Sequence, residues 1–217
     1  MKSISESGQN GSTASGPTDQ ARHELEHKLG QCMLHLQRYE AILKKFVAAN
    51  MVEGTMAALP TKLAKQTADA RVMTLGTLVR HFTEDYLVDS EQQVRTTKDA
   101  AEMIEGAEVP YMKMRFEMAM SSENYRKTAA SLTELKEMRN ALVHHFFERF
   151  DIEDAAQCAA ATSYLQACYL TIEIQLRQLK NWSDGADKTR LLAAAFIGSG
   201  AFGNAFLDGI EADSTDG

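Results

Sequence analysis

The sequence is poor in residues that interrupt or crosslink a chain, since only three of its 217 residues are proline and only three are cysteine. Cys32, Cys158 and Cys168 are odd in number and show no CxxC spacing, which argues against a disulfide framework or a zinc site. The N-terminus shows no apolar leader segment, and no apolar run reaches the roughly 20 residues that span a membrane. We therefore expect a cytoplasmic protein with buried, reduced thiols and no membrane contact.

An excess of positive charge, which is common in proteins that bind nucleic acids, is also missing, because the formal charge is −7. Residues 1–19 carry −1 and residues 183–217 carry −4, which leaves −2 for residues 20–182. Strong non-specific binding to duplex nucleic acid is therefore not expected. A body that is close to neutral can still hold a local basic cleft.

The residues that are abundant favour helices. Methionine, alanine, leucine, glutamate, lysine and glutamine are plentiful, whereas strand-favouring residues never cluster in runs of period two. We predict an all-α fold, an up-down bundle of four to five long helices with a tail at each end. Residues 1–18 are expected to be a disordered tail, residues 19–182 the helical domain, and residues 183–217 a short helix followed by a flexible acidic tail.

Apolar residues spaced three and four apart predict four long helices. The predicted ranges are about 19–50, 61–86, 122–150 and 151–182, with a mixed stretch at about 89–110 and a short helix at 191–197. The stripe of the first helix is the clearest, and consists of Leu25, Leu29, Cys32, Leu36, Tyr39, Leu43 and Phe46. Such stripes cannot be buried by one helix alone, so the helices must pack together.

Arg139 breaks the pattern of the third predicted helix. It lies on the apolar stripe, seven residues after Leu132 and seven residues before Phe146. A guanidinium at such a position needs either water or a partner acid. One interpretation is structural, in which the stem packs and the charged head reaches solvent or an acid in the core. The other interpretation is that the arginine serves a site.

The residues that follow Arg139 favour a site. Asn140 is next, and after three more residues come His144 and His145. The pattern R-N-x-x-x-H within LKEMRNALVHHF, from Leu135 to Phe146, resembles the signature of HEPN domains. The resemblance extends to a helical architecture with the motif on a late long helix, before one final long helix. It covers roughly residues 20–182.

This resemblance implies metal-independent cleavage of RNA, without a cofactor, by a toxin or phage-defence effector. His144 would act as general base or acid at the ribose 2′-hydroxyl and the leaving oxygen, with His145 as the alternative. Arg139 would hold the scissile phosphate, and Asn140 would orient the phosphate or the histidine. The products would carry 2′,3′-cyclic phosphate and 5′-hydroxyl ends. An antitoxin protein is the further partner that this implies.

A second function stays open, namely a helical module of the same kind that binds RNA or a protein without cutting. The geometry of the helix also sets a condition for the catalytic function, because Arg139 and His144 lie about 140° apart around a straight helix. Either the last helical turn is distorted, or two copies build a shared cleft. HEPN ribonucleases resemble the second solution, so we predict a homodimer with this helix at its interface.

Two further motifs match known functional motifs in sequence pattern only. His23 to His27 spell H-E-x-x-H, as in zinc peptidases, but Met33 stands where the extended motif needs a third histidine. Residues 198–203 match G-x-G-x-x-G, but no strand–turn–helix unit surrounds them. We interpret the first as a charged surface turn of a helix and the second as chance spacing in a tail.

Overall fold

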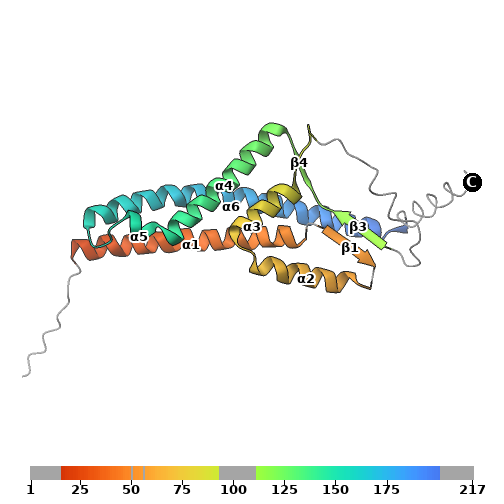
Figure 1. Ribbon diagram of the computed structural model, residues 1–217, viewed down its shortest axis with the longest axis horizontal. Helices are drawn as coiled ribbons and strands as arrows, with labels where there is room; N and C mark the ends of the chain where they lie inside the picture. The colour runs from red at the N-terminus through yellow and green to blue at the C-terminus, as the bar shows by residue number, and fades with distance from the viewer. Residues whose placement is uncertain (1–15, 50, 56, 93–110, 201–217) are drawn as a thin grey trace, which may run out of the picture.

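The computed structural model describes residues 16–49, 51–55, 57–92 and 111–200, and these residues are mostly helical (Figure 1). The helices are α1 (Pro17–Ala48), α2 (Leu59–Val72), α3 (Leu75–His81), the π-helical turn η1 (Phe82–Tyr86), α4 (Ser122–His144), α5 (Phe146–Arg149) and α6 (Ala155–Ile197). The strands are β1 (Met51–Thr55), β2 (Leu87–Asp89), β3 (Tyr111–Arg115) and β4 (Met118–Met120). The predicted helical class is confirmed at this level. Most of both predicted tails and of the mixed stretch lies outside the described residues.

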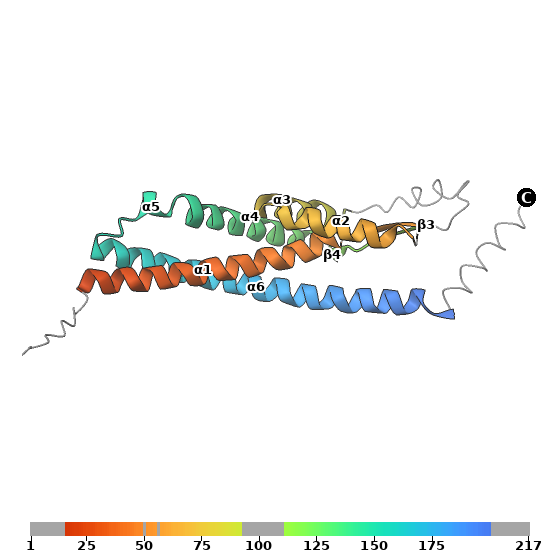
Figure 2. The same cartoon turned by 90° about the horizontal axis from the view of Figure 1, so that it is seen from below.

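The helices α1 and α6 are the longest in the fold, and they lie side by side and run in the same direction (Figures 1 and 2). Their apolar stripes meet each other, so that Cys32 and Leu43 of α1 and Leu165 and Ile172 of α6 are fully buried. The Cys32 thiol donates a hydrogen bond to the backbone carbonyl oxygen of Leu165, at 3.4 Å. Together, α1 and α6 form a two-helix layer along the length of the molecule.

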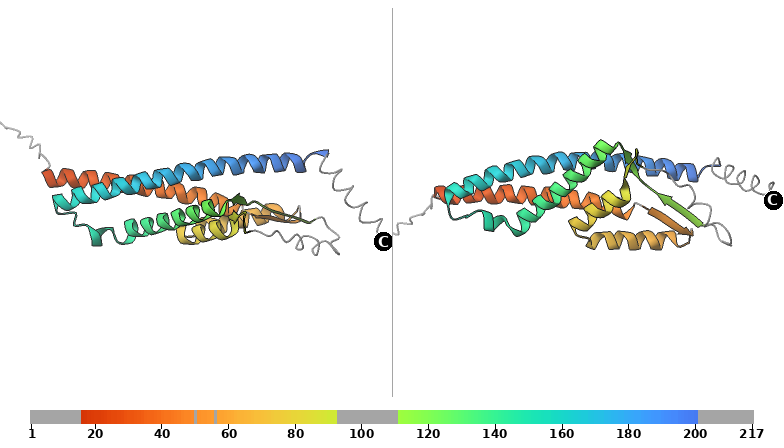
Figure 3. Two further views of the ribbon diagram at one scale, coloured as in Figure 1. Left: turned by 90° about the horizontal axis from the view of Figure 1, so that it is seen from above. Right: turned by 45° about the horizontal axis from the view of Figure 1, so that its top comes forward.

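The helices α2 to α5 lie on one side of this layer, as the views in Figures 2 and 3 agree. α4 crosses the layer obliquely, and the Ser131 hydroxyl of α4 donates a hydrogen bond to Oε1 of Gln175 on α6 at 2.8 Å. Farther along, the rings of Phe82 and Trp182 stack with their centroids 6.2 Å apart. These contacts between the two sides close the core.

Two short strand pairs were not predicted. β1 pairs antiparallel with β3, so that Met51 lies opposite Arg115, and β2 pairs in parallel with β4. Each pair joins segments that are distant in the sequence, and strands of this length are too short to show a pattern of period two. Gly54 in β1 has φ of +140°, a conformation that residues with a side chain rarely adopt. The strands lie at the end of the molecule away from the start of α1 (Figure 1).

Two predicted helix boundaries were wrong. The helix expected over residues 61–86 is interrupted, because Met73 is extended and the Thr74 hydroxyl accepts a hydrogen bond from the Thr77 N–H at 3.3 Å, which caps α3. The end expected near Trp182 does not exist, since α6 continues unbroken, and the predicted short helix at 191–197 is its last part. Gly185 alone does not stop a helix, because an interior glycine costs only about 1 kcal/mol relative to alanine.

The three cysteines are buried, as the sequence predicted. Burial raises the pKa of the Cys32 thiol to about 11, with a further contribution from the nearby Cys168. Among the described helices, none is both long enough and apolar enough to cross a bilayer.

Candidate functional site

The residues of the R-N-x-x-x-H pattern lie at the C-terminal end of α4. The Ser121 hydroxyl caps the start of this helix by accepting a hydrogen bond from the Asn124 N–H. The helix ends at His144, because His145 leaves helical geometry with φ of −124° and ψ of 7°. Phe146 then points into the core and begins the short helix α5. The helix predicted over residues 122–150 is thus broken beside its histidines.

Arg139 reaches across from α4 to an acid on α1. Its Nε atom lies 3.8 Å from Oε1 of Glu40, and the two side chains are 31% and 22% exposed. This contact agrees with the interpretation in which an arginine on an apolar stripe places its head on an acid of the core. Sequence analysis did not single out Glu40. The available signal was its position directly after Tyr39, a fully buried member of the α1 stripe.

The guanidinium of Arg139 also contacts His144, with Nη1 and Nε2 3.2 Å apart. Of the two arrangements considered from the sequence, a distorted last turn or a shared cleft between two copies, this contact within one chain agrees with the first. The backbone positions of the two residues do lie on different faces, but an arginine side chain is long enough to extend around the helix, and His144 is the last helical residue. Glu40, Arg139 and His144 form a continuous polar chain from α1 to the surface of α4, which we call the Glu40–Arg139–His144 relay.

The contact with Arg139 limits how His144 can form a hydrogen bond. A guanidinium can only donate hydrogen bonds, so a hydrogen bond across this contact needs Nε2 as its acceptor. The ring proton is then on Nδ1. As a result, the basic nitrogen of His144 faces the cationic head of Arg139.

The other two predicted site residues are placed differently. His145 is turned to Glu148, with Nδ1 and Oε2 2.9 Å apart, and both side chains are largely exposed. Its ring centroid lies 6.3 Å from that of His144. Asn140 is exposed on the surface of α4. Of the four predicted residues, the structure therefore brings Arg139 and His144 into direct contact, with His145 adjacent.

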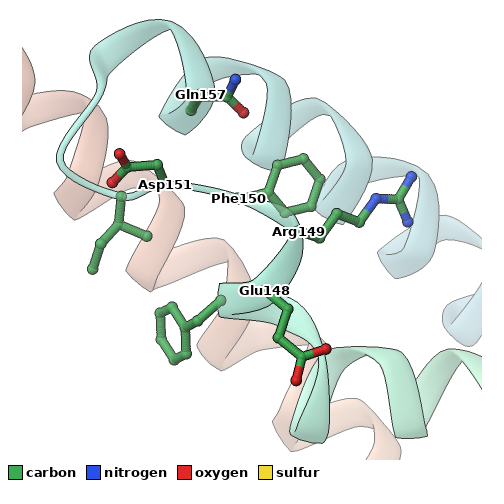
Figure 4. Close-up of a pocket in the computed structure, with 7 residues that line it drawn as sticks. Glu148, Arg149, Phe150, Asp151 and Gln157 are labelled. Atoms are coloured by element: carbon green, nitrogen blue, oxygen red, sulfur yellow. The ribbon is translucent and has the colours of Figure 1, made fainter.

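Two neighbouring cavities adjoin this end of α4. The smaller cavity, of about 270 Å³, is lined by Ala141, His145, Phe146, Glu148, Arg149 and Tyr164. The larger cavity, of about 440 Å³, is lined by Phe147, Glu148, Arg149, Phe150, Asp151, Ile152 and Gln157. Figure 4 shows how Glu148 and Arg149 of α5 extend in different directions at the larger cavity, with Phe150 between Arg149 and Asp151. Sequence analysis missed both cavities, because they form only where α5 packs against α6.

Aromatic rings hold Arg149 at both cavities. Its guanidinium carbon lies 4.3 Å from the ring centroid of Tyr164 and 5.3 Å from that of Phe150. Burial raises the pKa of the Tyr164 hydroxyl, the hydrogen bond to Cys168 and the charge of Cys168 raise it further, and Arg149 lowers it. Tyr164 thus stays a neutral hydrogen-bonding group beside a fixed cation.

The motif at His23 to His27 does not come together with further metal ligands. Both histidines are exposed on α1. Across residues 16–49, 51–55, 57–92 and 111–200, no group of three or more His, Cys, Asp or Glu side chains is placed to hold a metal ion. Comparisons of the chain with protein-family models, with curated proteins and with solved structures find no match. A functional assignment therefore rests on the geometry of the residues themselves.

Proposed function

We propose that this chain is a metal-independent endoribonuclease of the HEPN type, a cytoplasmic toxin or phage-defence effector. The observation that carries the proposal is the contact of 3.2 Å between Arg139 and His144 within an R-N-x-x-x-H sequence. An imidazole beside a guanidinium supplies both groups that the first step of ribose-assisted cleavage needs. The imidazole is a base for the 2′-hydroxyl, and the guanidinium is a fixed cation for the phosphate.

In the proposed reaction, Nε2 of His144 takes the proton of a ribose 2′-hydroxyl. The 2′-oxygen attacks the adjacent phosphorus atom, and the bond from phosphorus to the 5′-oxygen breaks. Arg139 turns from Nε2 to the phosphate oxygens and stabilises the charge that grows on them, while Glu40 retains the guanidinium. Asn140 lies on the exposed surface, where it can orient the phosphate. A proton delivered to the 5′-oxygen completes a 2′,3′-cyclic phosphate and a 5′-hydroxyl.

The leaving oxygen needs an acid on the side of the phosphorus opposite to the base. A single Nε2 atom cannot occupy both sides at once, and Nδ1 of His145 is engaged with Glu148. We therefore propose a homodimer in which a second copy brings its own His144, in the protonated form, to the same phosphate as the acid. The exposed side chain of Val143, directly before His144, is the apolar contact that we assign to this interface.

The second candidate is a non-catalytic module of the same kind that binds RNA or a protein. One observation favours it, namely that every polar head in the Glu40–Arg139–His144 relay already has a partner within the chain. A relay whose groups satisfy one another can fasten α4 to α1 without taking part in any reaction. In that case, removal of His144 would leave function unchanged.

The test is cleavage of single-stranded RNA by the purified protein in excess EDTA, with the ends of the products identified by mass. We expect cleavage to 2′,3′-cyclic phosphate ends, and a loss of at least about 100-fold in His144→Ala and in Arg139→Ala. His27→Ala is the matched control, since it removes another exposed histidine, on α1 and outside the relay. Equal activity of wild type and His144→Ala would refute the catalytic assignment, and activity that requires added divalent metal would also refute it.

A further inference from the structure

The five residues that follow His145 form a second candidate site next to the relay. Phe146 is buried, but the neighbouring Phe147 is 69% exposed and lies on the wall of the larger cavity. One exposed aromatic ring is common on protein surfaces. This ring differs because it shares its cavity with Phe150 and with a guanidinium that rings hold in place. Aromatic and cationic planes in one hollow are the elements with which proteins stack nucleobases.

Arg149 presents a flat, pre-positioned face. Its contacts with the rings of Tyr164 and Phe150, at 4.3 Å and 5.3 Å, restrict the side chain before any ligand arrives. A guanidinium that is fixed in this way loses little conformational entropy on binding, and its edge still carries N–H donors. The smaller cavity shares this arginine and adds Tyr164, which stays neutral because burial raises its pKa.

The charges around the cavities indicate which part of a nucleotide fits. Glu148 and Asp151 line the larger cavity together with Arg149, so acids outnumber the cation there. A phosphate would be repelled by this lining. A base offers amino groups that carboxylates accept, as carboxylate side chains accept from the amino group of cytosine. One oxygen of each acid is in use, at His145 for Glu148 and at the Glu153 N–H for Asp151, and the second oxygen of each is left for a ligand.

The smaller cavity lies beside the relay. His145 lines this cavity, and its ring centroid lies 6.3 Å from that of His144, which contacts Arg139. A nucleotide next to a phosphate at Arg139 would lie on the side of α4 where α5 begins. Bases are free to enter such a cavity only when they are not paired and stacked in a duplex.

We propose that Phe147, Phe150, Arg149 and Tyr164 bind one base of a single-stranded RNA whose adjacent phosphate lies at Arg139. This inference rests on the proposed function, because it takes the relay as the position of the phosphate. It makes single-stranded RNA the substrate class of the enzyme, because a base must be unstacked from a helix before this site can bind it. It also explains how an acidic protein engages RNA, with few phosphate contacts and at least one stacked base.

The experiment measures binding of a short single-stranded RNA that carries one 2′-deoxy nucleotide at the cleavage position and 2-aminopurine at the next position. Loss of one stacked base weakens binding by roughly 5- to 150-fold, and this is the effect expected for Phe147→Ala. The quenching of 2-aminopurine on binding should disappear in the same variant and return in Phe147→Tyr. The salt dependence of affinity should be unchanged in Phe147→Ala, whereas Arg139→Ala should reduce its slope by about 1.

Leu170→Ala is the matched control, because it also shortens an exposed apolar side chain, 50% exposed, on a helix surface that lines neither cavity. If Phe147→Ala binds and quenches like wild type while wild type cleaves RNA, the base site is wrong and the nuclease assignment stands. If binding depends on Phe147 but wild type does not cleave the unmodified RNA, the base site stands and the nuclease fails. If wild type binds no RNA, or if Phe147→Ala changes only the oligomeric state, the base site is overturned.

Discussion

The side chain of Arg139 extends through two environments, which is uncommon for one residue on a helix. Its stem starts on the buried stripe of α4, and its head connects an acid on α1 to an exposed histidine. Without Glu40, a cation at the edge of the core would lack its nearest opposite charge. Glu40 therefore has a positioning role in the proposed reaction, acting on the phosphate only through Arg139.

We expect Glu40→Gln to separate stability from activity. The ion pair is partly exposed, so its loss should lower the free energy of unfolding by no more than about 1 kcal/mol. The loss of a fixed orientation should lower the cleavage rate by about 10- to 100-fold, because small displacements of a catalytic group have effects of that size. Urea denaturation and single-turnover cleavage measure the two quantities.

Glu137→Gln is the control for this variant, since Glu137 is an exposed acid on α4, two residues before Arg139. It removes the same charge from the molecule without touching the relay. If Glu40→Gln cleaves RNA as fast as Glu137→Gln, then Glu40 has no positioning role and Arg139 is held by other contacts.

The residues of the site could be found from the sequence only one at a time. Arg139 was visible because it interrupts a heptad pattern, and His144 because of its spacing from Arg139. Their mutual geometry was left open between two arrangements, since helical angles describe where Cα atoms lie and not how far an arginine side chain extends. Glu40 could not be identified, because its partner lies on another helix and no local pattern connects them.

At the scale of elements, periodicity located the long helices but not their ends. The buried stripe of α1 agrees with the predicted one at six of its seven positions, Leu25, Cys32, Leu36, Tyr39, Leu43 and Phe46. The boundaries depend on features that are weaker in sequence, such as the cap at Thr74 and the conformation of His145. The strands depend on pairing between distant segments, which propensity alone does not reveal.

The continuation of α6 past Trp182 gives a prediction for Gly185. This glycine lies inside the helix, and an added Cβ would meet nothing within 4 Å. Gly185→Ala should therefore raise the free energy of unfolding by about 0.5 to 1 kcal/mol, through the helix propensity of alanine. Chemical denaturation followed by circular dichroism at 222 nm is the measurement.

Gly30→Ala in α1 is the positive control, because Gly30 is also helical and has equally open surroundings. Both substitutions should stabilise the protein by similar amounts if α6 unfolds together with the layer. Stabilisation by Gly30→Ala alone would mean that residues 183–197 do not belong to the cooperative helix, as the sequence had first predicted.

At the scale of the whole molecule, exposed apolar side chains on different elements are alternative contacts for a second copy. Val143 lies on α4 next to the relay and is 39% exposed. Leu34 of α1 and Leu170 and Ile174 of α6 are also exposed. These three belong to the two-helix layer, whereas α4 lies on one side of that layer (Figure 2). The proposed reaction favours the contact at Val143, because only there would a second copy add a histidine to the same phosphate.

A pair of charge substitutions can decide between α4 and the two-helix layer. Val143→Glu should convert a dimer into a monomer, because it buries an unpaired carboxylate between two copies. Ile174→Glu introduces the same charge on α6, at a side chain that is 62% exposed, and should leave the proposed dimer intact. Sedimentation velocity at micromolar concentration measures both variants beside wild type.

We further expect Val143→Glu to lose cleavage together with dimerisation, since each monomer keeps its own relay but lacks the acid from its partner. A wild-type monomer that cleaves RNA would show that one chain supplies both base and acid, and dissociation by Ile174→Glu alone would place the interface on α1 and α6.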